Sequence, residues 1–403
     1  MKRFRIPFTL SGSWQVASTL IIIAAGVGLL LFGSLDSLLP GYSETEVRTA
    51  NESRSLSVIA DNPINAPYKL LVLGIATTSG DPLLATRLAA GFFAIITLGL
   101  FYFGVRQWHT GRIAFLATVL FGCSAWFLHT ARFGSPDILL PLVVLLFAVV
   151  GYWIASAERS GISYLTAVLA LSVSIYVPGT IWLVLLALAV RRTKDFRVMA
   201  REFTLWHALS LTVALIALVV VPLALTLSRD PSFGLTLLGV PESWPGLTAF
   251  AKELAVIPLS LVVYSSFSAE FWLSSLPLLD IFSSALLFIG AYYFLKLRSL
   301  DRAKLVTIFI VLSAILVALP NAISLAALLP VVYIFISGGL ALLLGQWLTV
   351  FPRNPLAQNV GITFIAIAVA ASAFYNVRAY FVAWPNNTKT ESAYSRTTED
   401  LLQ

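Results

Sequence analysis

The chain has 403 residues, of which 59% are hydrophobic and only 11% are charged, and its mean hydropathy is +0.90. Soluble domains carry roughly 25% charged residues, so this composition excludes a soluble protein and indicates an all-α, polytopic membrane protein. The net charge of +7 lies in short loops and does not indicate a nucleic-acid partner, and the single cysteine, Cys123, excludes an intramolecular disulfide.

Apolar runs of about 20 residues predict about eleven transmembrane helices. The first run follows a basic start without a small-residue cleavage site, so we expect a retained helix rather than a removed signal peptide. The runs fall near residues 16–35, 83–105, 113–131, 138–157, 162–177, 179–190, 204–228, 277–295, 305–319, 322–347 and 359–376.

Two features interrupt this series. The sequence YVPGT at 176–180 predicts a tight turn between the fifth and sixth runs, and the run at 254–266 is short enough to be re-entrant or interfacial. No repeat or soluble domain is visible. Residues 1–376 therefore form one predicted transmembrane domain, and residues 377–403 form a polar, mobile outer tail.

The distribution of lysine and arginine predicts the orientation. With the N-terminus inside, the inner segments hold 16 of the 26 basic residues, all in short loops. The outer side then holds three longer segments, at 36–82, 229–276 and 377–403. Because cytoplasmic loops carry the excess of basic residues, this bias predicts an N-in, C-out topology.

The first outer loop contains a helix start. Ser43 followed by Glu46 is a capping box, so a helix is predicted to begin at Glu44. Apolar residues at helical spacing as far as Val58 make it a weakly amphipathic helix along the membrane. Glu46 has two interpretations: its carboxylate caps the helix, which the loop alone favours, or it lies near a substrate at the outer surface.

The sequence HTARFGSPD, residues 129–137, joins the third and fourth spans. Ser135-Pro136-Asp137 is a typical helix start, and Arg132 is also explained by contact with lipid phosphates. His129 is interpreted as a buried, hydrogen-bonded histidine. Asp81-Pro82 is an ordinary start for the second span, which carries Arg87 in its first turns.

What favours a site is the convergence of acids and bases on one face. Arginine pairs bidentately with phosphate, and a nearby carboxylate can accept a proton from an attacking hydroxyl or amine. A lipid phosphate is therefore the predicted substrate. The residues at the outer ends of the first four spans are Glu44, Glu46, Lys69, Arg87, Arg132 and Asp137.

The order of these motifs resembles the GT-C glycosyltransferases, in particular the protein O-mannosyltransferase and aminoarabinose transferase branch. In that family an acidic pair opens the first outer loop, an arginine begins the second span, and an arginine and an acid join spans three and four. The matches here are Thr45-Glu46 (or Glu44 with a register shift), Arg87 in ATRLAAG, and Ala131-Arg132 through Asp137. The resemblance covers residues 14–160, and a weaker resemblance is found at residues 277–293.

The resemblance implies a GT-C-like helical bundle that transfers one sugar, with inversion, from a polyprenyl-phosphate donor on the outer face of the cytoplasmic membrane. Glu46, or less directly Glu44, would be the base, and Arg132 and Arg87 would hold the donor phosphate, with Lys69 grouped beside them. Asp137 would orient the acceptor or a divalent cation.

The cation, Mg²⁺ or Mn²⁺ with Glu46 and Asp137 as ligands, is left open, as is the choice among a lipid, glycan or protein acceptor. Glu46→Gln and Asp137→Asn are predicted to abolish transfer and preserve the fold. The chain departs from the family pattern at Thr45, which holds the place of an Asp, and at 321–333, which lacks the late-span arginine of relatives.

Two other functions stay open. A flippase or transporter of a lipid-linked or small solute would need charges at mid-span or broken helices. Most predicted spans lack ionisable residues, and Asp280, the nearest to a within-span acid, lies close to a span end. The other alternative is an inactive scaffold that retains the GT-C-like fold.

Overall fold

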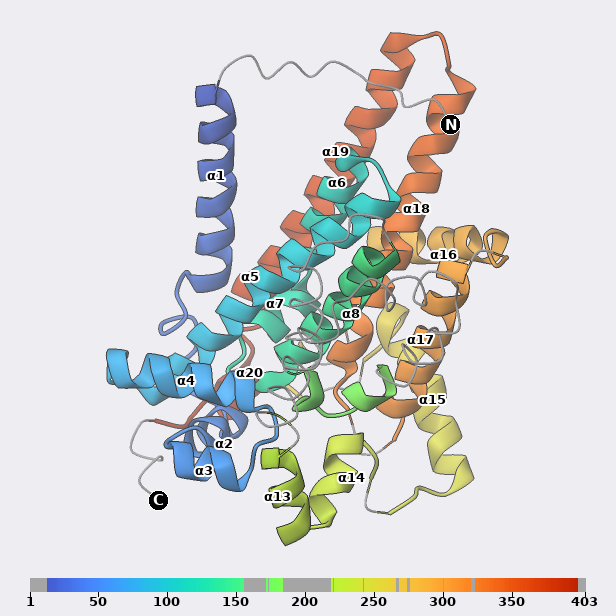
Figure 1. Cartoon of the computed structure of the whole chain (residues 1–403). Coiled ribbons are helices and arrows are strands. Elements are labelled where there is room, and N and C mark those ends of the chain that lie inside the picture. The colour runs from blue at the N-terminus through green and yellow to red at the C-terminus, as the bar shows by residue number, and fades with distance from the viewer. Residues whose placement is uncertain are drawn as a thin grey trace, which may run out of the picture.

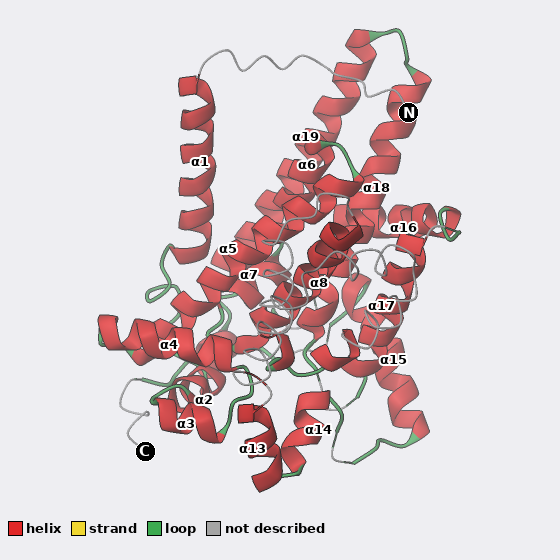
Figure 2. Cartoon of the chain, viewed as in Figure 1, coloured by secondary structure: helices red, strands yellow, loops and turns green. Residues whose placement is uncertain are grey.

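The computed structural model describes residues 13–155, 172, 174–183, 219, 221–241, 243–265, 268–273, 276–299, 301–319 and 323–397. These residues form helices and loops without a strand, which confirms the predicted all-α class (Figure 2). The helices are α1 (Ser13–Phe32), α2 (Glu44–Glu52), α3 (Leu56–Asp61), α4 (Ala66–Ser79), α5 (Pro82–Trp108), α6 (Gly111–Cys123), α7 (Ala125–Arg132), η1 (Pro136–Ile138), α8 (Leu139–Ala155), α13 (Val221–Arg229), α14 (Ser232–Leu238), α15 (Leu247–Val262), α16 (Ile281–Lys296), α17 (Asp301–Val317), η3 (Leu325–Leu328), α18 (Leu329–Val350), α19 (Pro355–Arg378), η4 (Ala379–Ala383) and α20 (Thr388–Ala393).

The long helices form a bundle with short helices gathered at one end. Helix α5 packs against α4, α6 and α8, α6 packs against α19, and α16 packs along α18. The short helices α2, α3, α13 and α14 lie at the end of the bundle opposite to the turn between α18 and α19 (Figure 1). The predicted first outer loop and the predicted inner loop around Arg353 therefore lie at opposite ends.

Two glycines allow α16 and α18 to pack closely. A side chain at Gly290 of α16 would collide with the backbone carbonyl of Phe335, and one at Gly339 of α18 would collide with that of Leu286. Because these residues lack Cβ atoms, the two backbones pack directly against each other, as small residues permit in membrane helix pairs.

Three helical stretches of the described residues are long and apolar enough to cross a membrane: Pro82–Trp108, Leu325–Val350 and Pro355–Ala383. They coincide with predicted runs. The predicted span at 113–131 is instead two helices, α6 and α7, bent by 62°. The bend occurs because Ser124 starts a new helix, its hydroxyl accepting from the Phe127 amide at 3.1 Å. The count of eleven spans is not established, since the runs at 162–177, 179–190 and 204–228 fall largely outside the described residues.

The first outer loop confirms the predicted helix start and corrects its length. Helix α2 begins at Glu44 with the full capping box between Ser43 and Glu46. The helix does not continue to Val58 as predicted: it ends at Glu52, and α3 begins a new helix with Ser55 as its N-cap. The serine side chains explain the break, because they satisfy backbone amides at a helix start.

Within the C-terminal tail, residues 377–397 are folded against the bundle, whereas the polar sequence predicts a mobile segment. The tail forms α20 and then pairs with the first outer loop, where Tyr42 and Arg396 exchange backbone hydrogen bonds of 3.0 and 3.1 Å. Tyr394 is buried and its hydroxyl donates to the Glu270 carbonyl at 2.7 Å. Aromatic burial therefore fixes this segment against the first loop.

Candidate active site

The first site residue, Glu46, lies on the buried side of α2. Its Oε2 accepts from the Ser43 amide at 3.0 Å, and the Ser43 hydroxyl accepts from the Glu46 amide at 3.2 Å. The side chain is fully buried, at the positive end of the helix dipole, where a carboxylate is stabilised. The capping interpretation of Glu46 is confirmed, and the second interpretation depends on what else surrounds it.

Arg87 of α5 lies against Glu46 and forms a bidentate ion pair with it. The Arg87 Nε lies 2.7 Å from Oε1 and Nη2 lies 2.9 Å from Oε2. The guanidinium also donates to the carbonyls of Leu35 (2.6 Å) and Gly41 (2.9 Å), and lies 4.2 Å from the ring centroid of Tyr42. Arg87 therefore joins the second span to the whole first loop.

The HTARFGSPD segment reaches the same carboxylate through its glycine. The Gly134 amide donates to Glu46 Oε1 at 3.1 Å. A Cβ atom at Gly134 would collide with the Thr86 side chain and lie 3.0 Å from Glu46 Oε1, so only glycine fits between them. Each oxygen of Glu46 consequently accepts two hydrogen bonds, and the carboxylate is fully satisfied.

Arg132, at the end of α7, has a different environment. It donates to the carbonyls of Leu30 (2.8 Å) and Gly33 (2.6 Å), which lie at the negative C-terminal end of α1. Its guanidinium lies 4.7 Å from the Phe381 ring centroid. Its Nε is buried and has no hydrogen-bond partner, and no acid of the described residues forms an ion pair with this side chain.

Glu46, Arg87 and Arg132 line one small cavity of about 10 Å³, together with Tyr380 and Tyr394. A cavity needs about 10–15 Å³ to hold one water molecule. The structure thus brings three of the six predicted residues together, and a sugar phosphate would enter only if the surrounding segments moved apart.

The other three predicted residues lie outside this cavity. Asp137 is in the short helix η1, with Ser135 as its N-cap as predicted. Burial raises the pKa of the Asp137 carboxyl, while hydrogen bonds from Ser135 and Ser324 and the charge of Arg48 oppose that rise. Glu44 is exposed in the first turn of α2. Lys69 forms an ion pair with Glu52 at 2.8 Å and donates to a backbone carbonyl.

A metal site does not assemble from these acids. In the described part of the chain no three His, Cys, Asp or Glu side chains lie close enough to hold an ion. Glu46 is already saturated by four hydrogen-bond donors, so the residues present do not fit the Mg²⁺ or Mn²⁺ left open by the sequence.

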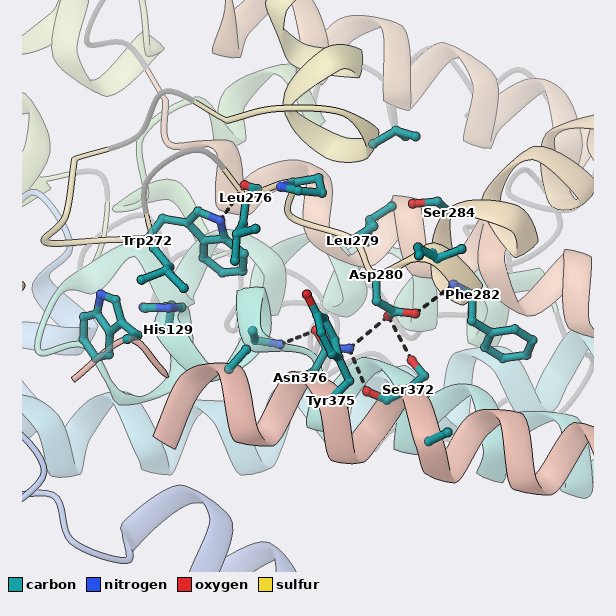
Figure 3. Close-up of a pocket in the computed structure, with 18 of the residues that line it drawn as sticks. His129, Trp272, Leu276, Leu279, Asp280, Phe282, Ser284, Ser372, Tyr375 and Asn376 are labelled. Carbon is teal, nitrogen blue, oxygen red and sulfur yellow. Dashed lines mark hydrogen bonds between the residues drawn. The ribbon is translucent and has the colours of Figure 1, made fainter. Parts of the chain in front are cut away.

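A larger pocket, which the sequence does not predict, also lies against α7. Its volume is about 630 Å³ and it lies among α7, α16, α19 and the segment before α16 (Figure 3). Asp280 caps α16 there and accepts from the Ser372 hydroxyl and the Asn376 amide, both at 2.9 Å. The sequence holds two signals for this pocket: Asp280 at the end of a predicted span, and Ser372 and Asn376, which are four residues apart in an apolar run and so share one helix face.

Comparison with known proteins identifies the fold. No protein-family profile matches the chain, and no curated protein sequence matches it. The crystal structure of ArnT from Cupriavidus metallidurans in the apo state is similar over 94% of this chain and 77% of ArnT, with a TM-score of 0.53 and 16% identity. The structure of the same ArnT bound to undecaprenyl phosphate gives 0.52 and 15% over the same shares. At this identity the likeness concerns the fold alone: the chain has a fold similar to that of ArnT.

Proposed function

We propose that this protein is a multi-pass membrane glycosyltransferase that moves a sugar, with inversion, from a polyprenyl-phosphate donor to an acceptor on the outer face of the cytoplasmic membrane. The observation that carries the proposal is the fold likeness over 94% of the chain to ArnT, one structure of which is bound to undecaprenyl phosphate. The excess of Lys and Arg in the short inner loops supports the side of the membrane.

Arg132 is the best candidate for the donor phosphate. Its Nε has no partner and its charge is not neutralised by an acid of the described residues. A buried guanidinium with a free N–H stabilises the negative charge that develops on the leaving phosphate. Arg87 and Lys69 are engaged with Glu46 and Glu52, so they would serve the phosphate only after those ion pairs separate.

In the proposed reaction, a hydroxyl or amine of the acceptor attacks the anomeric carbon. The bond between that carbon and the phosphate oxygen breaks, polyprenyl phosphate leaves, and the acceptor proton passes to a carboxylate. Glu46 and Glu44 are the family-based candidates for this base. Asp137 is a third, since its raised pKa lies closer to neutral pH, where a general base is most effective.

One observation favours the alternative of an inactive scaffold. Glu46 and Arg87 saturate one another, and the space between them and Arg132 is about 10 Å³. A site that stays closed in this way would stabilise the first loop without turning over. The two functions differ in whether a donor lipid reaches Arg132.

The deciding experiment is mass spectrometry of the lipids that co-purify with the detergent-solubilised protein. Wild type, Arg132→Ala and the matched control Arg54→Ala, an exposed arginine of the same outer loop, are compared. A polyprenyl-phosphate species enriched in wild type and in the control, and depleted in Arg132→Ala, supports the transferase and identifies the sugar where one is attached. Equal bulk phospholipid in all three samples would leave the scaffold as the better explanation.

A further inference from the structure

The pocket of about 630 Å³ is large enough for a small ligand or part of a lipid and is separate from the predicted site. His129 and Trp384 line both this pocket and the cavity at Arg132, so their rings form the wall between the two. None of the acids or bases predicted for sugar transfer lines the larger pocket.

At one end of the pocket, His129 is buried without a hydrogen bond. Its ring lies 4.9, 4.8 and 4.3 Å from the ring centroids of Trp272, Tyr380 and Trp384, and neither nitrogen has a hydrogen-bond partner among the described residues. A neutral imidazole carries one donor and one acceptor, and buried polar groups are nearly always paired. The predicted burial of His129 is confirmed, and its ring lines the pocket, where a ligand can supply the hydrogen bond that the described residues do not.

Along the wall, Asp280 supplies an uncompensated negative charge. Its carboxylate accepts five hydrogen bonds, all from neutral groups of α16 and α19, and it forms no ion pair with any basic residue that the structure describes. Because every one of these donors is neutral, no positive charge offsets the carboxylate. Ser284, one turn along α16, adds a buried hydroxyl without a partner.

Apart from His129, Asp280, Ser284 and the two polar residues of α19, Ser372 and Asn376, the lining consists of aliphatic and aromatic side chains, and so does its rim. Val262, Leu276 and Leu279 form part of the wall, and Ile281 and Tyr375, which are 91% and 54% exposed, lie where the pocket meets the surface. In a membrane protein an exposed apolar rim faces hydrocarbon, so the ligand enters from the bilayer and brings an apolar body.

We infer that this pocket binds one membrane amphiphile whose polar end is an amino or hydroxyl group and not a phosphate. An amine or a hydroxyl can form a hydrogen bond with a nitrogen of His129. The amine is attracted by the charge of Asp280, and the hydroxyl is not repelled by it. A phosphate would be brought close to an uncompensated carboxylate in a low-dielectric environment, where like charges repel strongly. The apolar walls hold the chain. This inference does not rest on the proposed function, because binding requires no turnover.

Photolabelling of the full-length protein in nanodiscs tests the inference. Three probes carry the same diazirine on an octadecyl chain and differ only in the end group: amine, alcohol or phosphate monoester. Peptide mass spectrometry then maps the labelled residues. We expect the amine and the alcohol to label segments 262–284 and 368–384 at least several-fold more than the phosphate.

Variants separate this pocket from general contact with lipid. Ala371→Trp fills the pocket and should remove the label, whereas Ala370→Trp, its exposed neighbour outside the lining, should not. His129→Phe keeps the ring packing and should reduce alcohol labelling several-fold. Asp280→Asn, which can still cap α16, should raise labelling by the phosphate.

Two results would overturn the inference. In the first, the phosphate probe labels the pocket as well as or better than the amine. In the second, all three probes label the lipid-facing surface evenly and Ala371→Trp makes no difference. Both results are measured on wild type, Ala371→Trp and Ala370→Trp. The test therefore remains valid even if Asp280→Asn does not fold.

Discussion

Arg87 and Glu46 form a bidentate ion pair in which both side chains are almost fully buried, 3% and 1% exposed. The two residues are 41 positions apart, and the pair fixes the first turn of α2 against α5. Breaking a buried pair by removing one partner leaves an uncompensated charge and costs about 3–5 kcal/mol, more than an exposed pair ever contributes. Loss of either partner is therefore expected to lower the stability of the protein, whatever part the pair has in the reaction.

We first predict that Arg87→Ala and Glu46→Gln each lower the unfolding free energy, by about 3–5 kcal/mol for the arginine. The double variant Arg87→Met/Glu46→Leu should recover most of the loss, because neither charge is then left alone. Denaturant unfolding in detergent measures this. Arg229→Ala is the control, since its 3.9 Å ion pair with Asp61 is exposed and its loss should have no measurable effect. Single variants as stable as wild type would contradict the burial argument.

The second prediction concerns Arg132. If it holds the donor phosphate, Arg132→Ala should reduce transfer by about 10²-fold or more, the effect of removing one donor at a developing negative charge. Arg132→Lys should be intermediate, since lysine keeps the charge but loses the planar geometry. Transfer is measured as isotope-labelled sugar moved from the polyprenyl-phosphate pool of membranes.

Its structural contacts provide the control for this prediction. Arg132 also binds the carbonyls at the end of α1, so the variant could act by releasing that helix. Thermal unfolding of the same samples separates the two effects. Loss of transfer with an unchanged unfolding temperature supports a role at the phosphate, and equal transfer by wild type and Arg132→Ala would reject it.

The sequence predicts those features of the fold and the site that depend on contacts between residues close to one another along the chain. The capping boxes and N-caps at Ser43, Asp81 and Ser135 depend on neighbours within four residues and were predicted correctly. The turn at Pro178-Gly179 is equally local, with Gly179 at φ +74°. The break at Ser124 is local as well, but an apolar run conceals it, since α6 and α7 have the composition of one span.

Contacts between distant segments cannot be derived from local sequence patterns. The sequence predicts that Glu46, Arg87 and Arg132 lie at one membrane face, but not that they share one cavity. The bidentate pairing of Glu46 with Arg87 depends on distances that no sequence pattern contains. The hydrogen bonds that hold Tyr394 and Asp280 join residues 124 and 96 positions apart, so both depend on tertiary packing that local sequence patterns do not contain.

A third prediction tests the close contact at Gly134. In Gly134→Ala the new methyl group meets the Thr86 side chain and the Glu46 carboxylate, so we expect destabilisation by about 1–3 kcal/mol, as in other overpacked sites. Thr86→Ala removes the nearest obstructing atom. The double variant should therefore be more stable than the sum of the single effects predicts, and additive effects would show that the two side chains do not meet.

The last prediction concerns Asp137, whose pKa is raised mainly by burial. An acid with a raised pKa in the fold binds its proton more tightly there than in the unfolded chain, so its contribution to stability is complete below the unfolded pKa and is lost as pH rises through the folded pKa. The ionised carboxylate is thus unfavourable to the fold at pH values above its folded pKa. Asp137→Asn should unfold at the same temperature as wild type or at a higher one.

Activity should respond in the opposite direction. If Asp137 accepts the acceptor proton, the carboxylate must be ionised, so transfer should fall as pH drops through its raised pKa, and Asp137→Asn should lose transfer at every pH. Glu44→Gln, an exposed acid of the same outer face, is the matched control and should keep its activity if Asp137 is the base. The effect of Asp137 on transfer is measured as a pH profile, and its effect on stability is measured as the unfolding temperature of the same samples. Stable Asp137→Asn protein that transfers sugar at the wild-type rate would return the base to Glu46 or Glu44, because only those carboxylates would then remain among the predicted acids.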